Sequence, residues 1–279
     1  MTLKEMLNKG AWASAMAASA ALGLAFLAPS GAWAAPAGAP GAHRSPELDP
    51  QLKSAVDLVS KNRFKEALGI IEPRAKNGDP EAQYLYALMF MEGKGVAKDL
   101  NQMVYWFKEA AQRNSAKAQF MLGQMFFLGK PVRQNVKEGL YWLDLAAKQG
   151  YPKALSRLGM VYFLGESVPK DVNKGVAMLK QAASLGDSAA QASLGTIFLG
   201  GSGVKADLNS SVRYLTMASD QRNPMAEFAL AQLYYSGSGV KKDEKQALIL
   251  FQRAAVQGYI PAQAALRKLQ QEKKIQIEK

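Results

Sequence analysis

The chain has 279 residues, no cysteine, one histidine and a formal net charge of +12 at pH 7. Without cysteine it forms neither a disulfide nor a thiolate zinc site, and a single imidazole at His43 excludes a cluster of histidine ligands. Walker, nucleophile-elbow and EF-hand motifs are also missing from the sequence. The composition therefore predicts no catalytic residue, no metal and no cofactor.

Residues 1–34 have the pattern of an export signal. Lys4 and Lys9 precede an apolar run rich in alanine and leucine, and the triplet Ala-Trp-Ala ending at Ala34 is a small-x-small cleavage site. We expect cleavage there, which would leave a soluble periplasmic protein without a transmembrane span. An uncleaved inner-membrane anchor is the alternative. Residues 35–48, rich in proline, alanine and glycine, are predicted to form a flexible tether.

Residues 49–78 carry two short amphipathic stripes. One passes through Leu52 and Val59, and the other through Phe64 and Ile71, with the spacing of one helix face in each case. They predict a degenerate helical pair that lacks the long loop of the repeats that follow.

The region 79–258 consists of five blocks of 36 residues. An alanine recurs at this interval, at Ala82, Ala118, Ala154, Ala190, Ala226 and Ala262. Each of the first five is followed, along the same helix face, by a bulky residue and then by an aromatic one, and a glycine ends this first helix. An Asp or Asn then caps a second helix. Such a repeat predicts one helical hairpin stacked on itself.

A small residue recurs in the middle of each first helix, beside the bulky one: Ala87, Gly123, Gly159, Gly195 and Ala231. Glycine inside a helix costs about 0.5–1 kcal/mol relative to alanine. Its recurrence at one position therefore predicts that a second helix packs closely there. Residues 259–279 begin a further first helix and turn polar, which predicts a C-terminal capping helix.

The pattern A-x-x-x-L-G-x-x-Y-x-x-G-x-G-V-x-x-D-x-x-x-A-x-x-W-x-x-x-A-A-x-x-G resembles the Sel1-like repeat, a relative of the tetratricopeptide repeat. Trp106 and Trp142 occupy the tryptophan position of that family. Pro131 and Ser167 replace the loop glycine, so we expect the loops of blocks two and three to differ in shape. The resemblance implies an all-α fold, a right-handed α-solenoid of stacked helix–loop–helix Sel1-like repeats.

The resemblance also implies a non-enzymatic scaffold or adaptor in the bacterial envelope, which binds a protein or peptide partner in a concave groove lined by first helices. The candidate groove residues are Tyr84, Met91, Phe120, Phe127, Phe163, Leu199, Phe228 and Tyr235. The alternative interpretation is that these side chains belong to the core between blocks. A cell-wall or β-lactam-related enzyme or ligand-binding protein is the alternative function, but the matching Ser-x-x-Lys triplets are loop coincidences without the other motifs of such enzymes.

Basic side chains recur in the loops and predict a basic edge along the stack. They are Lys98, Arg133, Lys170, Lys205, Lys241 and Lys242. Such an edge suits an acidic partner, an anionic polysaccharide or a membrane surface, and a merely solvated edge is the alternative. We expect no nucleic acid to bind, because the chain is predicted to be exported and lacks nucleic-acid-binding motifs.

Overall fold

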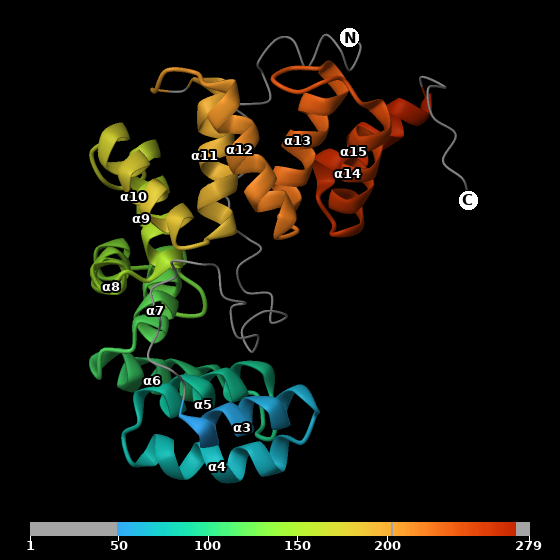
Figure 1. Cartoon of the computed structure of the whole chain (residues 1–279). Coiled ribbons are helices and arrows are strands. Elements are labelled where there is room, and N and C mark those ends of the chain that lie inside the picture. Colours follow the sequence, from blue (N-terminus) through green and yellow to red (C-terminus); the bar gives the residue numbers. More distant parts are fainter. Residues whose placement is uncertain (1–48, 202, 272–279) are drawn as a thin grey trace. The chain divides into compact units, whose positions relative to one another are not determined.

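The structure is a computed structural model that describes residues 49–201 and 203–271. Within these residues the chain forms 13 α-helices and no strand (Figure 1). The helices are α3 (Pro50–Ser60), α4 (Phe64–Lys76), α5 (Pro80–Glu92), α6 (Leu100–Gln112), α7 (Ala116–Leu128), α8 (Val136–Lys148), α9 (Pro152–Leu164), α10 (Val172–Ser184), α11 (Ser188–Gly200), α12 (Leu208–Asp220), α13 (Pro224–Ser236), α14 (Glu244–Val256) and α15 (Ile260–Gln271). The predicted export signal and tether lie outside the described residues.

The chain divides into two compact units at the loop between α9 and α10. The N-terminal unit ends at Pro169 and holds α3 to α9, and the C-terminal unit begins at Lys170 and holds α10 to α15. In the N-terminal unit α5 packs on α6 and α7 on α8, and each second helix packs on the next first helix. In the C-terminal unit α11 packs on α12 and α13 on α14 in the same way. The predicted all-α stack of helix–loop–helix repeats is confirmed.

The helix ends follow the predicted signals. Gly93 ends α5 with φ of 72°, and Gly129 ends α7 with φ of 70°, a left-handed conformation that glycine adopts without steric cost. The second helices begin at the predicted caps. The Oδ1 atom of Asp99, for example, accepts hydrogen bonds from the backbone N–H groups of Asn101 and Gln102, at 2.8 and 3.0 Å.

The expected difference between the loops of blocks two and three and the other loops is found at Pro131 and not at Ser167. The peptide bond between Lys130 and Pro131 is cis. Ser167 has φ of 63°, close to the 75° of Gly203 and the 71° of Gly239 at the same position of their repeats. In block three the serine thus adopts the left-handed backbone that glycine adopts elsewhere.

Buried glutamines in the first helices join consecutive repeats. Nε2 of Gln119 donates to the backbone oxygen of Ala111, near the end of the preceding second helix, at 3.1 Å. The same bond joins Gln83 to Ala75 at 3.1 Å and Gln191 to Ala183 at 3.2 Å. Each of these carbonyls also accepts a hydrogen bond from the backbone N–H three residues later, at 3.0 Å. Each glutamine therefore adds a second hydrogen bond to a carbonyl of the repeat before its own.

Block five replaces this glutamine by a carboxylate. Glu227 is fully buried, and its Oε1 forms an ion pair with the guanidinium of Arg253. Nη2 of Arg253 donates to the backbone oxygen of Ser219 at 3.1 Å, which is the carbonyl that a glutamine at position 227 would reach. Gln257 donates to the other carboxylate oxygen of Glu227 at 2.9 Å. The arginine thus takes over the donor role that the carboxylate cannot perform.

Candidate partner-binding surfaces

The predicted groove residues fall into two classes of exposure. Tyr84, Phe120, Phe127, Phe163 and Phe228 are buried. The remaining three, Met91, Leu199 and Tyr235, are partly exposed at the C-terminal ends of their helices. Partner binding by either class stays a prediction.

Three of the buried rings contact other aromatic side chains of the stack. The ring of Phe120 lies 5.4 Å from that of Tyr151, at the start of the next repeat. Phe228 and Tyr259 form the same contact in the C-terminal unit, at 5.5 Å. Tyr84 packs against Phe107 of its own repeat at 5.7 Å. These three rings therefore hold the helices of the stack together.

Phe127 has a cationic neighbour that our sequence analysis did not predict. Cζ of Arg157, in α9, lies 4.6 Å from the centroid of the Phe127 ring, in cation–π geometry. The Arg157 side chain is 12% exposed, and burial lowers its pKa. Its nearest carboxylate is Glu166, with Nη2 and Oε2 3.9 Å apart.

Arg157 could have been identified from the sequence by comparing the same position in all five blocks. The other four blocks have an uncharged residue at this position of the first helix: Leu85, Met121, Ser193 and Ala229. An arginine on a helix face that is otherwise apolar or small stands out once the blocks are aligned.

The six residues of the predicted basic edge are all exposed. Lys98 and Arg133 belong to the N-terminal unit, and the other four to the C-terminal unit. Lys242 forms an ion pair with Glu244 at 2.7 Å, and this hydrogen-bonded pair raises the pKa of Lys242. Contact between these residues and an acidic partner stays a prediction.

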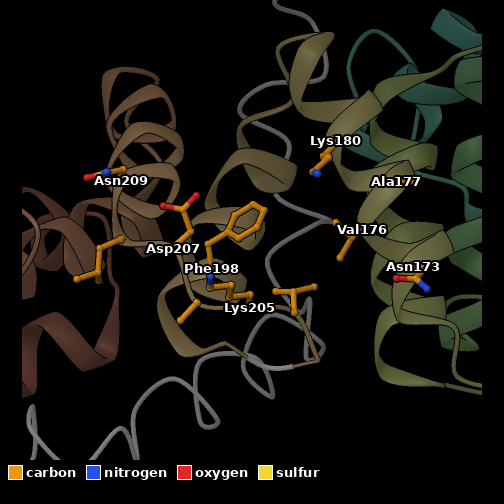
Figure 2. Close-up of a pocket in the computed structure, with 11 residues that line it drawn as sticks. Asn173, Val176, Ala177, Lys180, Phe198, Lys205, Asp207 and Asn209 are labelled. Carbon is orange, nitrogen blue, oxygen red and sulfur yellow. The ribbon is translucent and has the colours of Figure 1, made fainter.

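The C-terminal unit contains an open hollow of about 1010 Å³ between α10 and the loop that precedes α12. In Figure 2, Asn173, Val176 and Lys180 line it from α10, and Phe198 and Lys205 line it from the other side. Nζ of Lys180 lies 5.8 Å from the centroid of the Phe198 ring. One residue of the predicted basic edge, Lys205, thus also lines this hollow, which the sequence did not predict.

In residues 49–201 and 203–271 no three His, Cys, Asp or Glu side chains are grouped in a way that would hold a metal ion. None of the helices in these two segments combines the length and the hydropathy that crossing a membrane requires.

The family model described as Sel1 repeat matches five consecutive segments: 80–115, 116–151, 152–187, 188–223 and 224–259. Each begins one residue after the block boundaries taken from the sequence. No curated protein sequence matches the chain.

Several solved structures resemble this chain. A Sel1 repeat protein from Oxalobacter formigenes shares 31% identity with a TM-score of 0.71, over 78% of this chain and 89% of that one. A protective antigen of uropathogenic Escherichia coli, c5321, shares 28% identity with a TM-score of 0.65, over 82% of this chain and 50% of that one. The immunity protein Pa5087 from Pseudomonas aeruginosa is 22% identical with a TM-score of 0.56, over 78% and 86% of the two chains, and shares the fold.

Proposed function

Because the chain belongs to the Sel1 repeat family, whose members are generally protein-interaction scaffolds, we propose that it is an exported, non-enzymatic adaptor of the bacterial envelope. It holds a peptide segment or a protein surface against its first helices. The proposed location is the periplasm, after removal of the signal at Ala34.

The observation that carries this proposal is the difference between two adjacent positions of the first helix. The first of these positions is aromatic in all five blocks: Phe90, Phe126, Tyr162, Phe198 and Tyr234. The next position holds Met91, Phe127, Phe163, Leu199 or Tyr235, and the methionine, the leucine and the tyrosine are partly exposed there. Exposed side chains that vary on a constant framework provide a surface that can be specific for one partner.

Export is tested by fractionation and N-terminal sequencing of the protein produced in a Gram-negative host. We expect the mature chain to begin at Ala35 and to appear in the periplasmic fraction. Membrane-bound material that retains Met1 would contradict this part of the proposal.

The binding surface is tested with a partner captured from envelope extract by the mature chain and identified by mass spectrometry. Binding of the purified partner is then measured by calorimetry for two variants of the C-terminal unit. We expect Leu199→Ala with Tyr235→Ala to weaken binding at least tenfold. Ile249→Ala serves as the matched control, because Ile249 is 49% exposed on the second helix α14.

The basic edge is the competing binding site, and its variants and the salt dependence of binding distinguish it from the first-helix surface. Charge pairing is screened by salt, with a Debye length that falls from about 10 Å at 0.1 M to about 3 Å at 1 M. Apolar contacts do not weaken in this way. If Lys205→Glu with Lys241→Glu abolishes binding while the variant of Leu199 and Tyr235 retains the partner, the first-helix surface is wrong and the basic edge is the binding site.

A further inference from the structure

Arg157 is a mostly buried cation whose Nε atom has no hydrogen-bond partner. Its guanidinium is largely removed from solvent, yet no described residue accepts a hydrogen bond from it. The Nε atom is buried without a partner, and Glu166 at 3.9 Å is beyond hydrogen-bonding distance. The Phe127 ring, 4.6 Å from Cζ of Arg157, covers one face of the guanidinium, so an acceptor has to approach its N–H groups in the guanidinium plane.

The guanidinium of Arg157 lacks a hydrogen-bond acceptor. The Nε–H donor of Arg157 is buried without an acceptor, which is unfavourable. The Phe127 ring fixes the orientation of the group, which lowers the entropy lost when a ligand binds. An acceptor that reaches Arg157 from outside the chain therefore meets a donor that is already oriented and partly desolvated.

A second cation lies on the same face of α9. Lys153 precedes Arg157 by one turn, and residues four apart are neighbours on a helix surface. Lys153 is exposed. The two cations favour an anionic group on the ligand.

Apolar side chains adjoin Arg157. Phe127 covers its guanidinium from α7, and Met160 follows Arg157 by three residues on α9. Both are buried. A carboxylate on a chain with apolar neighbours matches this combination, because the arginine fork binds both oxygens of a carboxylate at once.

We propose that Arg157 anchors a carboxylate of the bound partner, an Asp or Glu side chain flanked by apolar residues of a peptide segment. This inference rests on the proposed function, because it specifies the chemistry of the segment that the first helices hold. Arg157 supplies the charge-assisted hydrogen bonds, and Lys153 adds a longer-range attraction.

The test uses the mature full chain and a defined probe. The probe is a set of fluorescein-labelled 12-residue peptides with one central Glu among Leu, Val and Phe residues, each paired with a peptide that has Gln in place of the Glu. Affinity is measured by fluorescence anisotropy. We expect the Glu peptide to bind at least about tenfold more tightly than its Gln partner, the factor that one hydrogen bond to a charged group provides.

Three variants test whether Arg157 causes the preference for the Glu peptide over the Gln peptide. Arg157→Gln should abolish the difference within each peptide pair, and Arg157→Lys should retain only part of it, because an ammonium lacks the planar fork. Arg63→Gln is the matched control. It also removes one positive charge from an arginine of the N-terminal unit, at the exposed start of α4, where Arg63 is paired with Glu66 at 2.6 Å. Circular dichroism melts exclude loss of fold as the cause.

The outcomes separate this inference from the proposed function. If the peptides bind but Glu and Gln peptides bind equally, or if Arg157→Gln keeps the preference, the carboxylate anchor is wrong and the adaptor function stands. If no peptide of the set binds, the anchor is also wrong, and the capture experiment on Leu199 and Tyr235 then decides the adaptor function independently.

Discussion

A Cβ atom on Gly123 would lie 2.7 Å from Cγ of Leu143 and 3.0 Å from its backbone nitrogen. The same relationship joins Gly195 to Leu215, whose Cγ would be 2.6 Å away. Contacts of this length do not occur between carbon atoms in a relaxed structure, so the glycine lets the two helices of a repeat approach. The predicted reason for the recurring small residue is confirmed at these two positions.

Gly123→Ala is therefore expected to destabilise the protein by about 1–3 kcal/mol, because the added methyl group forces α7 and α8 apart. Gly69→Ala is the matched control. Gly69 is exposed within α4, and a Cβ there would meet no atom within 4 Å. That change should stabilise the helix by about 0.5–1 kcal/mol. Chemical denaturation of both variants checks the prediction, and equal effects of the two changes would contradict the packing explanation.

Arg222 occupies a position where most other repeats have glycine. Its φ is 61°, and Gly150 and Gly186 have φ of 76° and 89° at the same position of their repeats. A left-handed backbone costs a residue with a Cβ about 1–2 kcal/mol. We expect Arg222→Gly to raise the free energy of unfolding by about 1 kcal/mol. Gly186→Ala, the reverse change, should lower it by a similar amount in the same denaturation assay, and a stabilising effect of that change would refute the backbone argument.

The ion pair of Glu227 and Arg253 gives a prediction about coupled substitutions. Arg253→Gln leaves a fully buried carboxylate without its cation, which is expected to cost about 3–5 kcal/mol. Adding Glu227→Gln removes the charge and restores the amide that other repeats use, so the double variant should unfold within about 1 kcal/mol of the parent chain. A double-mutant cycle measures the coupling. Additive effects would show that the two side chains do not compensate for each other.

Tyr259 gives a prediction about alkaline pH. Burial raises its pKa to about 12 from the usual 10.0, and its hydroxyl is buried without a partner. Below pH 10 the side chain is neutral in both the folded and the unfolded state. As pH rises from 10 to 12, the unfolded state loses this proton first, and stability falls.

Tyr259→Phe removes this loss and retains the ring contact with Phe228. The variant should match or exceed the stability of the parent chain at pH 8, and its advantage should grow between pH 10 and 12. Thermal melts across this range provide the measurement. An advantage that is constant with pH would show that Tyr259 does not titrate as its burial requires.

Much of the fold was predictable because each repeat encodes its local structure in local signals. The alanine spacing, the glycine after each first helix and the Asp caps all act within one hairpin, so Gly93 and Asp99 have the roles that the sequence indicates. The site was less predictable. Helical spacing says which face Phe127 and Tyr235 occupy, but not how closely the neighbouring repeat covers that face.

The contact of Arg157 with Phe127 and the hollow beside Lys180 have the same origin. Both depend on how helices of consecutive repeats approach, at separations of about one repeat along the chain. That approach is set by the summed packing of many side chains. Periodicity within one block carries no information about it.

The glutamine bonds between repeats have a consequence for the order in which the chain folds. The carbonyl of Ala111 acquires its side-chain partner only when Gln119, eight residues later, has entered the next helix. A chain that leaves the ribosome or a translocation channel N-terminus first therefore completes the end of each hairpin only as its successor forms. Two repeats lack a donor at this position: Leu155 offers Ala147 none, and in block five Arg253 donates to Ser219 in place of Glu227. The junction of α8 and α9, inside the N-terminal unit, therefore forms without a side-chain bond of this kind, and the end of α8 does not wait for α9 to supply one.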